Sequence, residues 1–301
     1  MTCSVVAVVT LAHGRHAHLR AQLAALAAGT RLPDIWVGAA MDDELLESVV
    51  RHQASSSRPA EKIEVVHLPR RHGHLPLAAA RNAAAARAIA LGADVLVFLD
   101  VDCLPSERLV ERYAEACQAM AGTSSGPRPP AVVSGAVHYL PPLSPGRGTY
   151  DLADLRRSEP HPARPVAPEL DIVPEADLRL FWSLSFGLSS AHWDELGGFD
   201  ETYVGYGGED TDFAMRLGRN GGRLYWLGDA TAYHQYHDVE DPPRRHLADI
   251  VRNSNLFHDR WGEFPMGEWL DAFAAEGLIT LSGQPPRWTL TPAAGTPART
   301  P

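Results

Sequence analysis

The alternation of short apolar runs with helix-forming runs over residues 1–140 most constrains the fold of this chain. Apolar runs without regular polar alternation are typical of parallel strands covered by helices on both faces. Repeated β-α-β units of this kind join through right-handed crossovers. The sequence therefore predicts an α/β fold with an open, mostly parallel sheet flanked by helices. The predicted strands span 4–10, 34–40, 62–68, 94–100 and 131–140, and the predicted helices span 16–29, 76–92 and 106–120.

The alternation stops after residue 140, which divides the chain. Residues 141–180 carry many prolines and charges with little periodicity, as in a functional loop, a lid or a disordered insert. An apolar run at 180–190, strand material at 223–237 and helices near 244–261 and 266–275 follow. The prediction is a binding half (1–140), an irregular insert or lid (141–180), a smaller acceptor-side half (181–276) and a flexible tail (277–301).

Charge and cysteine content exclude some classes of function. The formal net charge is −10, whereas nucleic-acid binding needs concentrated Lys and Arg, so we expect no nucleic-acid partner. A nucleotide is still compatible with this charge. Cys3, Cys103 and Cys117 show no metal-binding spacing and predict buried free thiols in a reducing compartment. The apolar start is too short to span a bilayer and follows no basic region, so we expect no integral membrane segment and a cytoplasmic location.

Two carboxylates follow the predicted strand 94–100. In the sequence VFLDVDC, Asp100 and Asp102 stand at the carboxyl end of that strand, the edge where open α/β sheets bind ligands. Such a pair can hold a hard divalent cation that bridges a diphosphate. An ordinary turn is the alternative, because Asp is common in turns.

The sequence YHQYH contains a second candidate for metal binding, His234 and His237. Neutral imidazole is a good ligand for Mn or Zn. On a strand, however, this spacing points the two side chains to opposite faces, so that only one faces a shared site unless the chain turns. Surface or partly buried histidines without a ligand are the alternative.

The sequence YGGEDTDFAMRL begins with Gly207 and Gly208 after its tyrosine and continues with three acids at a helix start. Acids there are favoured by the helix dipole, which explains them without any chemistry. The glycine pair serves either a turn or the close approach of backbone to a sugar. Asp212 lies about 200° around the helix from Asp210 and is assigned to structure.

Arg81 lies early in the helix at 76–92, where it could join the helix dipole in holding a phosphate. A solvated helix position is the alternative.

Taken together, FLDVDC, GGFDETYVGYGGEDTDFAMRL and YHQYH resemble the glycosyltransferases of the GT-A fold, which is Rossmann-like. The order and spacing are similar to the C-terminal region of the β-1,4-galactosyltransferase family, joined to a family 2-like nucleotide-binding half. The resemblance spans roughly residues 4–261, apart from the insert. It implies a glycosyltransferase of the hexosyltransferase class that uses a nucleotide-sugar, most simply a UDP-sugar, with Mn²⁺ or Mg²⁺. A glycan, a lipid-linked sugar or a small molecule would be the acceptor.

The resemblance also assigns roles to single residues. Asp102 is implied as a metal ligand together with His237 and His234, the family having Met and His at these two positions. Asp210 matches the proposed catalytic base and Glu209 the neighbouring acceptor contact, while Tyr206 replaces a tryptophan that packs against sugar. The donor contacts implied are Asp100 for the ribose or sugar, Arg15 and Arg81 for the nucleotide, and Asp42 with Asp43 for the uracil.

The expected reaction is an inverting transfer in which Asp210 accepts the proton of the acceptor hydroxyl. Three alternatives remain at this point: a retaining GT-A enzyme of the polypeptide N-acetylgalactosaminyltransferase type, a nucleotidyltransferase, and an inactive sugar-nucleotide-binding protein.

Overall fold

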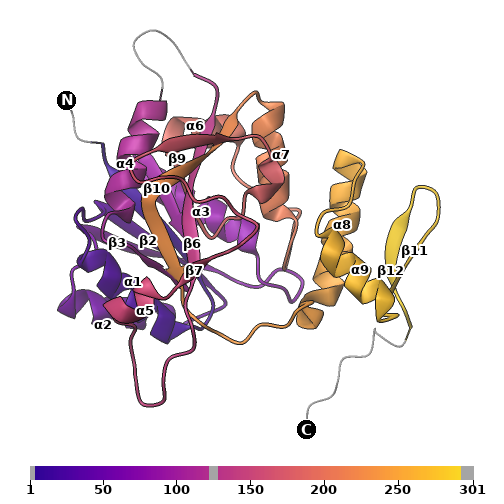
Figure 1. Ribbon diagram of the computed structural model, residues 1–301, viewed down its shortest axis with the longest axis horizontal. Helices are drawn as coiled ribbons and strands as arrows, with labels where there is room; N and C mark the ends of the chain where they lie inside the picture. The colour runs from indigo at the N-terminus through magenta and orange to yellow at the C-terminus, as the bar shows by residue number, and fades with distance from the viewer. Residues whose placement is uncertain (1–3, 122–127, 293–301) are drawn as a thin grey trace.

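The computed structural model describes residues 4–121 and 128–292. One large sheet forms its centre (Figure 1). Its strands are β1 (Val6–Ala12), β2 (Ile35–Met41), β3 (Lys62–Leu68), β4 (Val95–Leu99), β5 (Cys103–Pro105), β6 (Ala131–Tyr139), β7 (Glu159–Pro160), β8 (Ile172–Glu175), β9 (Ser185–Ser189) and β10 (Arg223–His234).

The strand order is β3-β2-β1-β4-β9-β6-β10-β5, with β7 paired to β6 and β8 paired to β10. Strands β3, β2, β1 and β4 are parallel to one another, and β6 is parallel to β10. Strand β9 lies antiparallel between these two groups. The predicted α/β fold, with a large and mostly parallel sheet flanked by helices, is confirmed.

Two apolar cores lie on opposite faces of the sheet because successive strand side chains point to opposite sides. Val6 and Val8 of β1 belong to one core, and Ala7 and Val9 belong to the other. The first core packs against α1 (His16–Ala27), α2 (Leu46–Ser56) and α4 (Leu109–Met120), and the second packs against α3 (Leu77–Ala90), α6 (Ser190–Leu196) and α7 (Glu209–Arg219).

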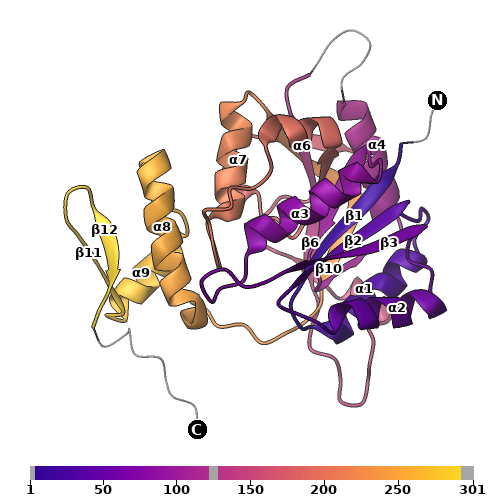
Figure 2. The same ribbon diagram turned by 180° about the vertical axis from the view of Figure 1, so that it is seen from behind.

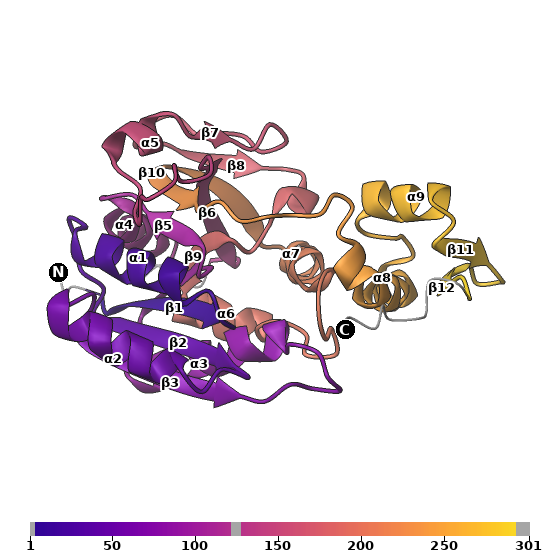
Figure 3. The same ribbon diagram turned by 90° about the horizontal axis from the view of Figure 1, so that it is seen from below.

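The C-terminal elements stand to one side of the sheet, with α7 between them and the strands (Figures 1 and 2; Figure 3 shows the same order from below). They have an apolar cluster of their own, which includes Phe273 and Trp288. These elements are η2 (Arg244–His246), α8 (Leu247–Trp261), α9 (Gly267–Ala275), β11 (Ile279–Ser282) and β12 (Arg287–Leu290).

The hairpin β11–β12 lies in the segment 277–301 for which composition predicted a flexible tail. It forms because Ile279 and Trp288 are buried against α8 and α9, a contact that composition does not reveal. Residues 293–301 of that segment, like Cys3, lie outside the described residues. Cys103 and Cys117 are buried free thiols, as predicted.

The segment 141–180 also contains more regular structure than its sequence predicted. Besides β7 and β8 it forms α5 (Leu152–Arg156) and η1 (Leu178–Leu180). Asp151 begins α5 with a capping box, and Glu175 of β8 accepts a hydrogen bond of 2.7 Å from Trp226 Nε1 of β10. Pairing with β6 and β10 therefore orders a sequence without periodicity of its own. Among the described residues, no helix combines the length and apolarity that a bilayer crossing requires.

Candidate active site

The carboxyl ends of β1, β2 and β4 meet at one edge of the sheet, and four of the predicted site residues follow these strands. Arg15 comes after β1, Asp42 after β2, and Asp100 and Asp102 after β4. The buried Gln22 of α1 shapes the last of these turns, because its Nε2 donates to the carbonyl oxygens of Asp100 at 2.7 Å and Cys103 at 2.9 Å.

Asp102, His234 and His237 form a cluster whose candidate ligand atoms all lie within 4.8 Å of one another. Asp102 Oδ1 is 3.7 Å from His234 Nε2, and Asp102 Oδ2 is 3.6 Å from His237 Nε2. Small side-chain movements would bring all three to the bond lengths of about 2.0–2.2 Å found for a divalent ion. Within the part of the chain that the structure describes, this is the one such group of three.

Both histidines reach Asp102 because the chain leaves the strand between them. β10 ends at His234, and the following residues have no strand pairing. Gln235 fixes the turn, since its backbone N–H donates to the Asp102 carbonyl at 2.7 Å and its side chain donates to the His18 carbonyl at 3.2 Å. The sequence indicated that both histidines could face one site only if the chain turned between them. The structure shows this change of direction after His234.

Charges around Asp102 favour the protonation states that a metal needs. Burial by itself would raise the pKa of Asp102, but the adjacent imidazoles and the Arg15 guanidinium outweigh it and lower the pKa to about 2. Burial lowers the pKa of His234, which keeps its ring neutral. An ionised carboxylate with two imidazoles suits an ion such as Mn²⁺. Arg15, predicted to approach the nucleotide, forms an ion pair with Asp102.

Glu209 and Asp210 begin α7, directly after Gly207 and Gly208. The two glycines have φ of +92° and +89°, a left-handed conformation that other residues adopt only with strain. Asn253 of α8 holds the same loop, because its Nδ2 lies 2.8 Å from the Gly207 carbonyl oxygen. The glycine pair thus serves a tight turn that presents the two acids.

Arg81 joins the two sides of the site. Its buried guanidinium lies 3.5 Å from Asp100 Oδ1 and 3.2 Å from Glu209 Oε1. Desolvation raises the pKa of Asp100 and of Glu209 to about 7 in each case, against the opposing charge of Arg81. Burial also raises the pKa of Asp210. In this structure Arg81 is therefore paired with carboxylates, whereas the sequence had placed it at a phosphate or in solvent.

The two acids after β2 differ in their partners. Asp42 is exposed and accepts a 2.6 Å hydrogen bond from Arg70 Nε. Asp43 accepts from the backbone N–H of Gly14 at 2.8 Å and from His16 at 2.9 Å. Burial alone would raise the pKa of Asp43, but these hydrogen bonds outweigh it and lower the pKa. Asp43 thus holds the loop after β1 in place, and Asp42 lies on the surface of the protein.

Asp212 is fully buried and accepts hydrogen bonds from Arg216 Nε at 2.9 Å and Trp261 Nε1 at 3.0 Å. This network agrees with the structural role predicted for it. Tyr206 is partly exposed, and its ring stacks on His246 with 4.5 Å between the ring centroids.

Three positioning residues were not found from the sequence: Gln22, Gln235 and Asn253. Their partners are backbone carbonyl groups of segments far away in the chain, and no local motif marks such contacts.

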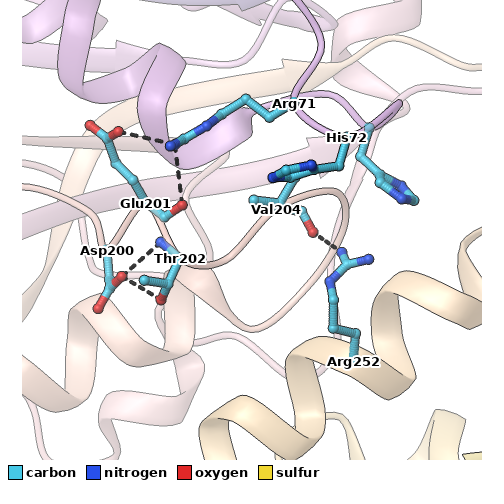
Figure 4. A pocket seen from close by; sticks show the side chains of 8 residues that line it. Arg71, His72, Asp200, Glu201, Thr202, Val204 and Arg252 are labelled. Carbon is cyan, nitrogen blue, oxygen red and sulfur yellow. Dashed lines mark hydrogen bonds and ion pairs between the residues drawn. The ribbon is translucent and has the colours of Figure 1, made fainter.

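A cavity of about 520 Å³ is lined by residues of the segments 71–74 and 200–204 and by Arg252 of α8 (Figure 4). Its charged side chains are already paired: Arg71 lies 3.2 Å from Glu201, Arg252 donates to the Val204 carbonyl and pairs with Asp249, and Asp200 pairs with Arg260. The cavity is lined by Arg71, His72, His74, Asp200, Glu201, Thr202, Val204 and Arg252, and the predicted catalytic and metal residues lie outside this set.

Comparison with solved structures identifies the fold. The chain superposes on TarS of S. aureus with a TM-score of 0.56 (16% identity, covering 90% of this chain and 42% of TarS). It superposes on the mannosyltransferase PcManGT of Pyrobaculum calidifontis, in complex with GDP-Man and Mn²⁺, with a TM-score of 0.54 (16% identity, 91% and 70%). The fold is that of the GT-A glycosyltransferases. At these identities the likeness concerns the fold alone.

Sequence comparisons agree with the GT-A fold. A family model described as the N-terminal domain of galactosyltransferase matches residues 174–238, the segment with both the glycine-rich motif and the two histidines. Validoxylamine A glucosyltransferase of Streptomyces hygroscopicus subsp. limoneus is 26% identical over 239 residues, which cover 72% of this chain and 48% of that protein. The chain therefore spans about half the length of this relative. The expectation of a GT-A type protein similar to glycosyltransferases is confirmed.

Proposed function

We propose that the chain transfers a sugar from a nucleotide-sugar, in the first instance a UDP-sugar, to an acceptor hydroxyl with inversion at the anomeric carbon. One observation carries the proposal: a cluster suited to a divalent cation (Asp102, His234, His237) lies beside two acids, the buried Glu209 and the half-buried Asp210. Arg81 links the two sides, because it pairs with both Asp100 and Glu209. Solved GT-A structures with UDP or GDP-Man support a nucleotide-sugar donor.

Asp102, His237 and His234 would hold Mn²⁺ or Mg²⁺, which when bound neutralises the negative charge on a leaving diphosphate. Asp100, 25% exposed at the side chain, lies two residues from Asp102 and would accept hydrogen bonds from the hydroxyls of the donor. The pairing of Arg81 with Asp100 and Glu209 fixes both carboxylates relative to each other before substrate binds.

Asp210 would act as the base. Its Oδ1 accepts a 2.8 Å hydrogen bond from the Thr211 backbone, which orients the carboxylate at the start of α7. The acceptor oxygen forms a bond to the anomeric carbon while its proton passes to Asp210, and the electron pair of the breaking C–O bond leaves with the nucleoside diphosphate. Glu209 would contact the acceptor.

The acceptor-side half (181–276) is proposed to be of galactosyltransferase type, with support from the family model that ends at residue 238. A small molecule is the first acceptor class to test, because the relative in Streptomyces is named for transfer to validoxylamine A. The partly exposed ring of Tyr206 offers a surface for a sugar ring.

A donor screen tests the proposal. Purified protein is mixed with UDP-glucose, UDP-galactose, UDP-N-acetylglucosamine or GDP-mannose, with and without MnCl₂, and both the melting temperature and nucleoside diphosphate release are measured. We expect one nucleotide class to raise the melting temperature only with Mn²⁺, and its sugar to be transferred with inverted anomeric configuration by NMR. A product of retained configuration would contradict the inverting mechanism, and the absence of any shift would contradict the function.

A further inference from the structure

The side chain of Arg164 is buried and has no hydrogen-bond partner among the described residues. Arg164 lies in the segment between β7 and β8, and only 7% of its surface is exposed. Its Nε, Nη1 and Nη2 atoms are all shielded from water, and none forms a hydrogen bond within the described residues. A guanidinium has five N–H donors and stays protonated. The buried side chain of Arg164 therefore lacks the anion that would normally accept its hydrogen bonds and neutralise its charge.

Aromatic rings surround the Arg164 guanidinium. Its central carbon lies 4.8 Å from the centre of the Trp226 ring and 5.3 Å from that of the Trp182 ring. Its backbone N–H donates to the His161 carbonyl at 3.0 Å, and the His161 N–H donates to Val137 of β6 at 3.4 Å. The turn that carries Arg164 is therefore attached to the central sheet.

Such contacts do not replace an ionic partner. A ring face offers no acceptor to the five N–H groups of a guanidinium, and it does not neutralise a buried charge as a carboxylate or phosphate does. An arginine kept in this state by the fold is best explained by a partner that comes from outside the chain.

The position of Arg164 indicates what that partner is. The Trp182 ring that the guanidinium covers belongs to the residue two before Leu184, whose carbonyl oxygen accepts a 2.9 Å hydrogen bond from the Asp100 backbone N–H. In the turn that carries Arg164, the His161 ring lies 5.8 Å from the Tyr139 ring, which in turn lies 5.0 Å from the His234 ring. The turn thus lies beside the segment of Asp100 and beside the metal cluster, which is where the diphosphate of a donor would lie.

The other two arginines at this site are already paired. Arg15 contacts Asp102, and Arg81 contacts Asp100 and Glu209. Both lie among acids, whereas Arg164 has no carboxylate within ion-pair distance in the described chain.

We propose that Arg164 binds the diphosphate of the donor and stabilises the charge that this group gains as the sugar leaves. The inference rests on the proposed function and extends it, since it gives the segment 141–180 a direct part in donor binding. Because the guanidinium is shielded from water, the turn at 161–164 has to move as the diphosphate enters. A planar guanidinium matches two phosphate oxygens at once.

Arg164→Met tests the proposal, because it keeps the length of the side chain and removes its charge. Binding of UDP and UMP is measured by calorimetry with Mn²⁺, together with the melting temperature of the free protein. A charged hydrogen bond contributes about 1.5–3 kcal/mol, so UDP affinity should fall roughly 10- to 150-fold. The preference for UDP over UMP should shrink with it, and the melting temperature of the free protein should hold or rise. A purely structural arginine predicts instead a lower melting temperature with UDP binding unchanged.

Two further variants complete the test. Arg179→Gln removes an arginine of the same segment that is exposed and pairs with Asp177, and it should bind UDP like the unmodified protein. Arg164→Lys keeps the positive charge but removes the planar guanidinium, and it should lose part of the affinity for UDP. If the methionine variant does not fold, the lysine variant replaces it in the test.

The outcomes separate this inference from the proposed function. If the unmodified protein binds UDP with Mn²⁺ and both Arg164 variants bind it equally well, the role of Arg164 is overturned while the function stands. A selective loss of UDP-glucuronate with unchanged UDP would likewise overturn it, in favour of a carboxylate on the sugar. If the unmodified protein binds no nucleoside diphosphate, the proposed function fails and this inference with it.

Discussion

The two acids at the start of α7, Glu209 and Asp210, have different partners, and we infer their separate roles from this difference. Glu209 is buried with one oxygen 3.2 Å from Arg81, whereas Asp210 has a backbone hydrogen bond from Thr211 and no ion pair in the described residues. A carboxylate oxygen held in an ion pair is less free to meet the acceptor hydroxyl, whereas the Asp210 carboxylate has no such partner in the described residues. Asp210 is therefore the base in our proposal, and Glu209 is a fixed neighbour.

Replacing Asp210 by Asn tests this difference directly. The amide keeps the shape of the side chain but cannot accept the proton, so turnover should fall about 10²–10⁴-fold. Binding of the nucleotide should be nearly unchanged, because Asp210 is not part of the metal cluster. Steady-state rates and UDP calorimetry on the same preparation measure the two effects. Turnover equal to that of the unmodified protein would exclude Asp210 as the base.

The pH dependence of turnover is a second prediction at this scale. Burial raises the pKa of Asp210 above that of an ordinary aspartate, so its active, ionised form appears only at higher pH. Activity should therefore rise with pH through this raised pKa and be lost as pH falls. A rate that stays flat down to the ordinary aspartate pKa of about 4 would contradict the assignment.

At the scale of elements, α8 positions the glycine-rich loop. Asn253 is fully buried, and its Nδ2 faces the carbonyl oxygens of Val204, Tyr206 and Gly207. Asn253→Ala would leave these carbonyls unsatisfied, which costs about 1–3 kcal/mol of stability. It should also lower turnover, because the loop leads directly into Glu209 and Asp210.

Asn255 provides the matched control for this prediction. It lies on the same helix but forms hydrogen bonds with the backbone of Trp288 in the terminal hairpin, at 2.8 and 2.9 Å. Asn255→Ala should lower the melting temperature with little change in turnover per folded molecule. Equal losses of turnover in the two variants would argue against a specific role of α8 in the site.

The elements predictable from sequence were those with strong local patterns. The apolar runs became β1 to β4 and β6 within one or two residues at most ends, and helical spacing located α1, α3 and α4. β8 and β12 were not predictable, because each is stabilised by pairing and burial against distant segments. The turn that brings His237 beside His234 depends on Gln235, whose partners lie on the other half of the chain.

At the scale of the whole molecule, the site exists only where the two halves meet. The turn after β4 supplies Asp100 and Asp102, β10 and the turn after it supply the histidines, and α7 supplies the acids. Sequence motifs named these residues as candidates, but the pairing of Arg81 with Asp100, 19 residues later, and with Glu209, 128 residues later, was not predicted. The sequence had offered a phosphate contact or a solvated position for Arg81. Its pairing depends on how α3 and α7 pack on the same face of the sheet, which no local pattern encodes.

Metal-dependent nucleotide binding is measured by calorimetry of UDP, with and without Mn²⁺, on the unmodified protein and on Asp102→Asn. We predict binding by the unmodified protein that depends on Mn²⁺. In the variant, affinity for Mn²⁺ and for UDP should fall together, because the carboxylate that His234 and His237 face has been lost. UDP and Mn²⁺ binding in Asp102→Asn equal to that of the unmodified protein would contradict the metal site and the mechanism built on it.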